Sequence, residues 1–185
     1  MRKNISFIMT VMFLTSSFMI AQDASPFQRP SPGPERAKLA FLVGSYTTET
    51  RVITNSAAGN GGMGKGTSVV TWGLDSMFVM LDEQSINQVL GNYKGHGMLG
   101  YDNREAKYVL SMFNNFGDSP QYRGNFTGDT LMLMTRVQYP GGSFDQKLAW
   151  YRENKNIRFK VYNDIGDGFV LVIDQTSTPS SNTKN

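Results

Sequence analysis

The chain has 185 residues, a formal net charge of +3, 19 glycines and no cysteine. Its length suits one domain with short extensions. The lack of cysteine excludes disulfides, thiol catalysis, cysteine-ligated metals and a lipid anchor attached to an N-terminal cysteine. Arg2 and Lys3 lie in a segment that we expect to be removed, which leaves a charge of 3 − 2 = +1. No Lys/Arg cluster occurs elsewhere, so the sequence carries no electrostatic footprint for nucleic acid.

Residues 1–21 have the three parts of a secretory signal. Arg2 and Lys3 form its positive start, the stretch from Ile5 to Ile20 is apolar with small polar interruptions, and Ala21 is a small residue before a cleavage point. We therefore predict an exported protein, periplasmic or secreted, with no membrane span once the signal is removed. The alternative is an uncleaved membrane anchor, which the short and interrupted apolar stretch disfavours.

The next segment, residues 22–37, is rich in proline and polar residues and is predicted to be a linker. Its end overlaps a helix expected near residues 34–43, because Pro34 suits the first helical position and Gly44 suits a helix end. The folded domain is expected over residues 38–177. Residues 178–185 are expected to form a disordered tail.

From Gly44 onward, apolar and polar residues alternate, which is typical of half-buried strands. Turn-forming pairs such as Asp102-Asn103 and Gly128-Asp129 separate the alternating stretches. The pattern predicts an all-β fold, a closed antiparallel barrel of about ten strands with one short N-terminal helix, because closure removes exposed sheet edges. The candidate strands are 45–53, 66–73, 76–85, 92–101, 106–115, 119–126, 129–136, 145–153, 156–163 and 168–176.

Several segments resemble known families. Leu39–Tyr46 resembles the entry of lipocalin-like proteins, in which a Gly-x-aromatic step opens the barrel. Gly95–Asp102 is similar to the G-x-G-x-x-G-Y-D segment of the DUF1579 family of uncharacterised proteins, and Lys107-Tyr108-Val109 and Gly124-Asn125-Phe126 follow at the expected distances. The resemblance covers roughly residues 38–176 and implies a lipocalin-like barrel, but it implies no established activity.

The chain departs from that family pattern at two places. The family commonly has tryptophan and aspartate after the Lys-Tyr-Val strand, where this chain has Met112 and Asn114. The first strand commonly carries tryptophan where this chain has Tyr46. If the family aspartate acts as a base, Asn114 cannot replace it.

Two glycine runs, Gly59-x-Gly61-x-x-Gly64 and Gly95-x-Gly97-x-x-Gly100, match the spacing of a dinucleotide-binding loop. That site needs a preceding parallel strand and a following helix whose N-terminus holds the pyrophosphate, and neither run opens a helix. We interpret residues 54–66 as a loop at the barrel mouth, where Lys65 could meet an anionic ligand group. The second run indicates close strand packing.

His96 is the only histidine, and no HxH or HxxxH pair exists, so we predict no metal site and no cofactor. By strand alternation, His96 lies on the same face as Lys94, and this polar neighbour favours an outward side chain for His96. The alternative is a haem ligand, because one histidine suffices for that role and small barrels can hold haem. Asp82 and Glu83 are neighbours and point to opposite sides of a strand, so they cannot act as a carboxylate pair. No catalytic residue is assigned.

The strands carry aromatic and methionine side chains that either fill the barrel or line a cavity. Trp150 and Arg152 share a strand face, so the ring could cover an apolar body while the guanidinium holds a carboxylate or phosphate. We therefore expect a binding barrel for a small apolar or anionic amphiphilic molecule. The ligand-binding candidates are Trp72, Asn114, Trp150, Arg152 and Lys65.

Two alternatives stay open. The first is a lipocalin-like enzyme that acts on a small molecule through Asn114, Arg152 or His96. The second is a structural or interaction protein whose barrel interior is solid. An open cavity with convergent polar groups favours a binding protein or an enzyme, and a filled interior favours the structural protein.

Overall fold

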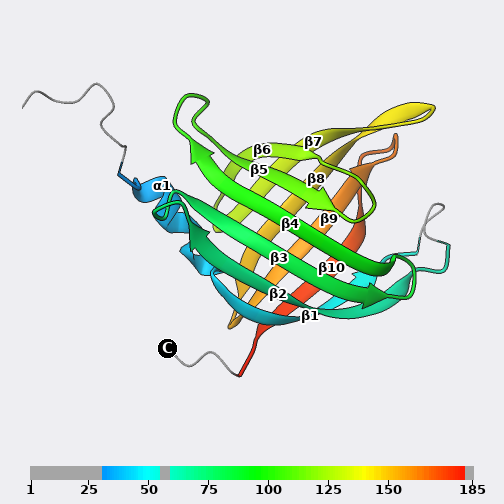
Figure 1. Ribbon diagram of the computed structural model, residues 1–185. Coiled ribbons are helices and arrows are strands. Elements are labelled where there is room, and N and C mark those ends of the chain that lie inside the picture. The colour runs from blue at the N-terminus through cyan, green and yellow to red at the C-terminus, as the bar shows by residue number, and fades with distance from the viewer. Residues whose placement is uncertain (1–30, 55–58, 182–185) are drawn as a thin grey trace, which may run out of the picture. The chain divides into compact units, whose positions relative to one another are not determined.

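The computed structural model describes residues 31–54 and 59–181 (Figure 1). A helical segment comes first, made of α1 (Pro34–Ala37) and the 3-10 helix η1 (Lys38–Leu42). The predicted signal segment, residues 1–21, lies outside the described residues. No helix of the described ranges is long and apolar enough to cross a membrane. Ten strands follow: β1 (Gly44–Val52), β2 (Gly62–Gly73), β3 (Phe78–Asn87), β4 (Gly91–Asp102), β5 (Lys107–Asn114), β6 (Gln121–Thr127), β7 (Thr130–Tyr139), β8 (Gly142–Glu153), β9 (Asn156–Asp164) and β10 (Phe169–Pro179).

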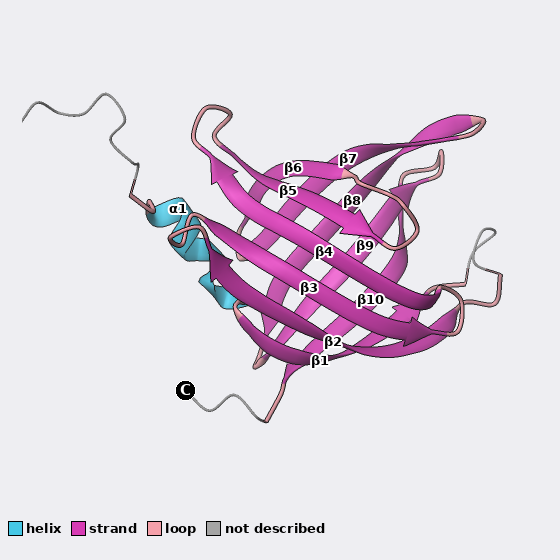
Figure 2. Ribbon diagram, viewed as in Figure 1, coloured by secondary structure: helices cyan, strands magenta, loops and turns pink. Residues whose placement is uncertain are grey.

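The strands form one closed barrel in the order β1-β10-β9-β8-β7-β6-β5-β4-β3-β2 (Figure 2). Each strand pairs antiparallel with its neighbour in the chain, and β1 closes the barrel against β10, where Thr50 lies opposite Gln175. The predicted all-β barrel with one short N-terminal helical segment is confirmed. Alternation decides the side of each residue, because successive side chains of a strand point to opposite faces.

Some strands extend further than the sequence predicts. β2 begins at Gly62, so the end of the expected 54–66 loop is strand, and residues 55–58 of that loop lie outside the described residues. A Cβ at Gly66 would lie 2.2 Å from the carbonyl oxygen of Gln84, so only glycine fits this close strand approach. β10 continues to Pro179, which lies opposite Tyr46 of β1.

The barrel has two different ends (Figure 1). The helical segment and the β2–β3, β4–β5, β6–β7 and β8–β9 turns lie at one end, which we call the helix end. The β3–β4, β5–β6, β7–β8 and β9–β10 connections lie at the other, which we call the open end. This division follows from the up-and-down order of the strands.

Buried side chains fix the helical segment to the barrel. Leu39 and Leu42 belong to the buried core, and the fully buried Tyr108 of β5 packs in the same cluster. The Tyr108 hydroxyl donates to the carbonyl oxygen of Glu35 at 2.7 Å and lies 2.9 Å from its carboxylate. Hydrogen bonds from Lys38 and then Tyr108 hold the pKa of Glu35 below its usual value. The Lys-Tyr-Val strand therefore positions the helical segment.

The Gly-x-aromatic step has a simple structural cause. The Tyr46 hydroxyl donates to the carbonyl oxygen of Leu42 at 3.0 Å, so its ring folds back over Gly44. A Cβ at residue 44 would lie 2.9 Å from the Tyr46 hydroxyl oxygen, which leaves room only for glycine. The step thus fixes the direction in which β1 leaves the helix end.

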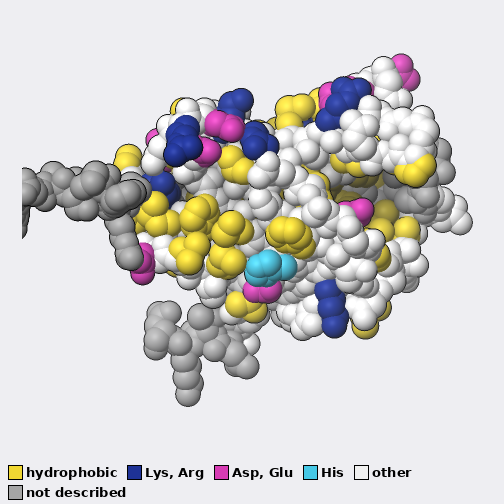
Figure 3. Space-filling view, turned by 45° about the horizontal axis from the view of Figure 1, so that its top comes forward, with side chains coloured by type: hydrophobic (Ala, Val, Ile, Leu, Met, Phe, Trp, Pro, Cys, Tyr) yellow, Lys and Arg dark blue, Asp and Glu magenta, His cyan; other side chains and the backbone are white. Residues whose placement is uncertain are grey.

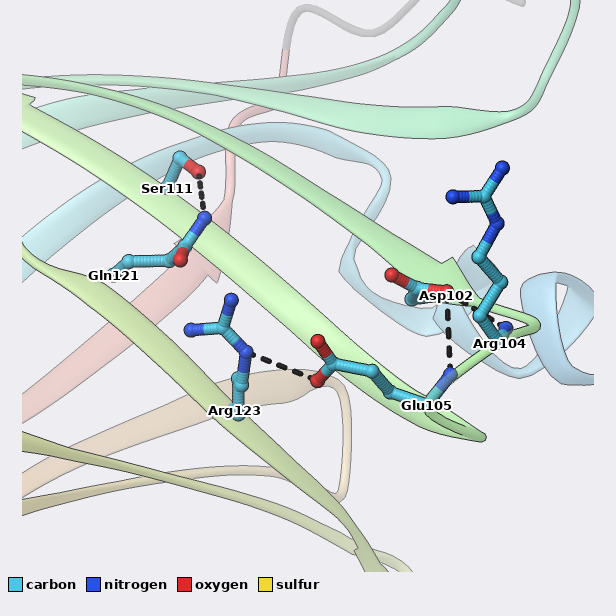
Figure 4. Close-up of polar contacts among 6 residues, drawn as sticks. All are labelled: Asp102, Arg104, Glu105, Ser111, Gln121 and Arg123. Atoms are coloured by element: carbon cyan, nitrogen blue, oxygen red, sulfur yellow. Dashed lines mark hydrogen bonds and ion pairs between the residues drawn. The ribbon is translucent and has the colours of Figure 1, made fainter.

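The Asp of the Gly-Tyr-Asp segment shapes the β4–β5 turn (Figure 4). The Asp102 carboxylate accepts from the backbone N–H groups of Arg104 at 2.7 Å and Glu105 at 3.3 Å. Glu105 in turn pairs with Arg123 of β6 at 3.0 Å. These contacts give Asp102 a structural role at the helix end, away from the barrel interior.

Candidate functional site

The barrel encloses a cavity of about 820 Å³. Each of the ten strands contributes lining residues, and Leu42 of η1 lines it from the helix end. Leu90, Phe116 and Tyr139 line it at the open end, so the cavity extends to the β3–β4, β5–β6 and β7–β8 connections. The barrel interior is therefore not solid.

Exposed apolar side chains surround the open end. They come from the strand ends and connections there and are between 37% and 76% exposed. They are Met63, Ile86, Val89, Phe113, Phe116, Tyr139 and Ile165. Such a concentration of apolar surface beside a cavity is typical of an entrance for apolar molecules.

One wall of the cavity is apolar. Trp150 of β8 stacks on Phe159 of β9, with the ring centroids 4.6 Å apart. Leu148, Val161 and Ile173 extend this wall over β8, β9 and β10. The wall suits the hydrocarbon body of a small molecule.

The opposite wall, formed by β3 to β6, carries the main ionisable groups. Glu83 of β3 faces the cavity, and the loss of water around it raises the pKa of its carboxyl to about 7. A hydrogen bond from Gln175 works in the opposite direction and lowers that pKa. The Gln175 side-chain oxygen accepts from the Thr50 hydroxyl at 3.0 Å, which fixes the orientation of the amide.

Among the residues that the structure describes, no basic side chain neutralises Glu83. Within residues 31–54 and 59–181, no lysine, arginine or histidine forms an ion pair with its carboxylate. An unpaired carboxylate away from water is unfavourable, so Glu83 holds a proton more readily than an exposed glutamate does. This carboxyl can change charge near neutral pH.

Two tyrosines accompany Glu83 on this wall. Burial is the main cause that raises the pKa of Tyr93 to about 12, and the nearby Glu83 and Asp118 carboxylates raise it further. Burial is also the main cause that raises the pKa of Tyr122 to about 12, with smaller contributions from Tyr93 and Asp118. Both hydroxyls therefore stay protonated at neutral pH and can donate hydrogen bonds. The Tyr122 hydroxyl donates to the side-chain oxygen of Gln146 at 2.6 Å.

The second glycine run makes room for this wall. A Cβ at Gly95 would lie 2.5 Å from the Tyr93 hydroxyl oxygen, and one at Gly97 would lie 2.8 Å from the Met112 sulfur. Gly95 also lies opposite Glu83 in the β3–β4 register. The run is therefore close strand packing that lets the Tyr93 ring lie along the cavity wall.

Two of the five sequence-predicted ligand residues line the cavity. Trp150 belongs to the apolar wall, as described above. Asn114, the last residue of β5, lines the cavity near the open end. Its side-chain oxygen accepts from the backbone N–H groups of Phe116 at 3.0 Å and Asp118 at 3.1 Å. Asn114 therefore shapes the β5–β6 loop.

The other three predicted residues lie outside the cavity lining. Trp72 packs against the buried core. Lys65 is exposed and forms an ion pair with Glu49 at 3.4 Å. Arg152 lies near the end of β8, where its guanidinium donates to the carbonyl oxygen of Phe41 at 3.3 Å. Neither predicted cation thus faces the cavity.

His96 lies on the outer surface of β4, cyan in Figure 3 beside an acidic side chain. Its Nδ1 is 2.7 Å from a carboxylate oxygen of Asp82 on β3. A histidine on the outer face cannot ligate a haem held inside the barrel. In the described part of the chain, no group of three or more histidine, aspartate or glutamate residues could hold a metal ion. The residues of the enzyme hypothesis, Asn114, Arg152 and His96, lie at the open end, the helix end and the outer face.

Sequence reasoning missed the polar side chains that face the cavity. Glu83, Tyr93, Tyr122 and Gln175 face the cavity, and none was proposed. A signal existed for Glu83, because Val79, Leu81 and Glu83 alternate on one face of β3. It was ambiguous, since Met80 and Ile86 make the other face partly apolar as well.

Comparisons with known proteins agree with this fold. A family model described as "Protein of unknown function (DUF1579)" matches residues 31–161. The crystal structure of Rv2717c from M. tuberculosis is similar to this chain, with a TM-score of 0.59 and 13% sequence identity. The alignment covers 80% of this chain and 98% of that one. At this identity the likeness shows the fold alone. No curated protein matches the chain.

Proposed function

This chain belongs to the DUF1579 family, and from its cavity we propose that it is a binding protein for a small amphipathic molecule. The observation that carries the proposal is the cavity of about 820 Å³, which is lined by the mainly apolar side chains of β8 to β10 and by the Glu83 carboxyl of β3. A volume in this range suits small-molecule ligands, which are typically held by apolar surface with a few placed polar groups.

The fold supports the same function. Each strand is hydrogen-bonded to neighbours on both sides, so the backbone of the wall is complete without a ligand. The exposed apolar side chains at the open end give an apolar molecule a path from water into the cavity. Binding requires no large rearrangement of such a preformed site.

The N-terminal segment adds a proposal about location. Residues 1–21 have the parts of a secretory signal, so we propose that the protein meets its ligand outside the cytoplasm. N-terminal sequencing of the protein from its native host should give a start near Gln22. Recovery of intact Met1 in an integral-membrane fraction would contradict export.

Native mass spectrometry after gentle purification tests the binding function. We expect a species heavier than the polypeptide by the mass of a retained small molecule. Val137 of β7 lines the cavity, whereas Met134 of the same strand is exposed. Val137→Trp should therefore remove the retained molecule, and Met134→Trp should leave it bound. Retention that is equal in both variants would place the molecule outside the cavity.

A further inference from the structure

We propose that the cavity selects a molecule in which a cationic head, such as an ammonium or quaternary ammonium group, is joined to an apolar body, with Glu83 as the counter-charge. This inference rests on the proposed binding function, because it names the class of molecule that the cavity holds. It follows from the charges, the aromatic groups and the shape of the lining.

The charges of the lining favour a cation. Glu83 and Asp118 are its carboxylates, and Arg136 is its only basic residue among those that the structure describes. Arg136 is already engaged near the open end, with Asp145 at 3.4 Å and the Ser143 hydroxyl at 3.0 Å. Glu83 accepts a hydrogen bond from Gln175 but forms no ion pair with any residue in the described ranges, so a cationic head would supply the missing counter-charge.

Aromatic side chains line the same side of the cavity as Glu83. Tyr93 is close enough to Glu83 and Asp118 for both carboxylates to raise its pKa. Its ring centroid lies 5.9 Å from that of Phe116, and Tyr122 lies on the same wall. The faces of such rings attract ammonium groups, and quaternary ammonium ligands are commonly bound in this way. Carboxylates beside aromatic rings therefore form a site that suits a cation better than an anion.

The apolar wall accounts for the rest of the molecule. Trp150 and Phe159 stack on β8 and β9, across the barrel from β3 and β4. When the head group lies at Glu83, the apolar body of the molecule therefore lies against the Trp150 and Phe159 rings. An anionic head would instead meet two carboxylates, since Lys65 and Arg152 lie outside the lining. The same geometry disfavours the anionic amphiphile that the sequence indicates.

Calorimetry with three octyl compounds separates these cases. Octyltrimethylammonium, octanol and octanoate share one chain and differ in the charge of the head. At pH 8 and 0.15 M salt we expect octyltrimethylammonium to bind most tightly. Glu83→Gln should weaken that binding at least about tenfold and leave octanol within about twofold. The matched control is Asp82→Asn, which removes a carboxylate from the outer face of the same strand and should leave all three affinities unchanged.

The pH dependence gives a second readout that needs no variant. Because burial raises the pKa of Glu83 to about 7, the affinity for octyltrimethylammonium should rise about tenfold between pH 6 and pH 8. Tyr93 and Tyr122 face the same space and stay protonated over this range. Asp118 from the β5–β6 loop and Arg136 from β7 are the other charged groups of the lining.

Each outcome decides a claim. Tighter binding of octanol or octanoate, an unchanged affinity in Glu83→Gln, or a flat pH profile would overturn the cation proposal and leave the binding function standing. Binding of none of the three compounds would count against the proposed function itself. If Glu83→Gln did not fold, the pH profile of the unmodified protein would decide.

Discussion

Glu83 makes the stability of the ligand-free protein depend on pH in an unusual direction. Its pKa rises from the unfolded value of 4.5 to about 7 in the folded protein. Folding therefore takes up a proton between these pH values. The stability from this proton is fully present below about pH 4.5 and is lost as the pH rises through 7. The complete loss amounts to about 3.5 kcal/mol, because one pKa unit corresponds to about 1.4 kcal/mol.

Urea unfolding of the ligand-free protein and of Glu83→Gln at pH 5, 6, 7 and 8 measures this effect. Glutamine carries no charge, so the variant should gain stability over the unmodified protein as the pH rises, by about 2.5 kcal/mol between pH 5 and pH 8. Because the Glu83 side chain is only partly buried, solvent screening makes this an upper value. Asp82→Asn should show no such trend relative to the unmodified protein. A constant difference between Glu83→Gln and the unmodified protein across this range would refute the reasoning.

Three further substitutions test the packing around the cavity. Gly95→Ala brings a Cβ within 2.5 Å of the Tyr93 hydroxyl oxygen. We expect the free energy of unfolding in urea to fall by about 1–3 kcal/mol and the tyrosine fluorescence to change. Unchanged values would contradict the close packing. Tyr108→Phe removes the hydrogen bond to the Glu35 carbonyl oxygen and should cost about 1–2 kcal/mol, with faster hydrogen exchange in the helical segment; equal exchange would show that this bond does not hold the segment. Phe159→Ala removes a ring that packs against the core on one side and lines the cavity on the other. The free energy of unfolding should therefore fall by about 3 kcal/mol, the lower end for such truncations. A loss below about 1 kcal/mol would place the ring outside the packed wall.

The sequence predicted most of the fold because the barrel depends on local patterns. Alternation and turn pairs are short-range signals, and they placed all ten strands within a few residues of their observed ends. The largest error in a strand boundary is at the start of β2, where glycines replace the alternating apolar residues. Strand β2 packs tightly against its neighbours, which explains the glycines at positions 62, 64 and 66. From the sequence alone, where the neighbouring strand is not known, such a glycine run predicts a loop.

The cavity could not be predicted in the same way. Whether a barrel is filled or open depends on side chains that are far apart in the sequence. Glu83 and Gln175 interact across the space between β3 and β10, which no spacing rule connects. Arg152 shows the opposite error. Its two-residue distance from Trp150 suggested a shared site, but the strand ends there, and the guanidinium reaches the Phe41 carbonyl group at the helix end.

The methionine methyl groups offer the most direct test of the central claim that a small molecule binds inside the barrel. Met112 lines the cavity, whereas Met134 is exposed on the outer face of β7. In protein labelled with ¹³C at the methionine methyls, titration with octyltrimethylammonium and with octanol should shift the Met112 resonance and saturate. The Met134 resonance should stay in place. Shifts confined to Met134, or growing without saturation at both residues, would show that these molecules bind only to the outer surface and would contradict the account.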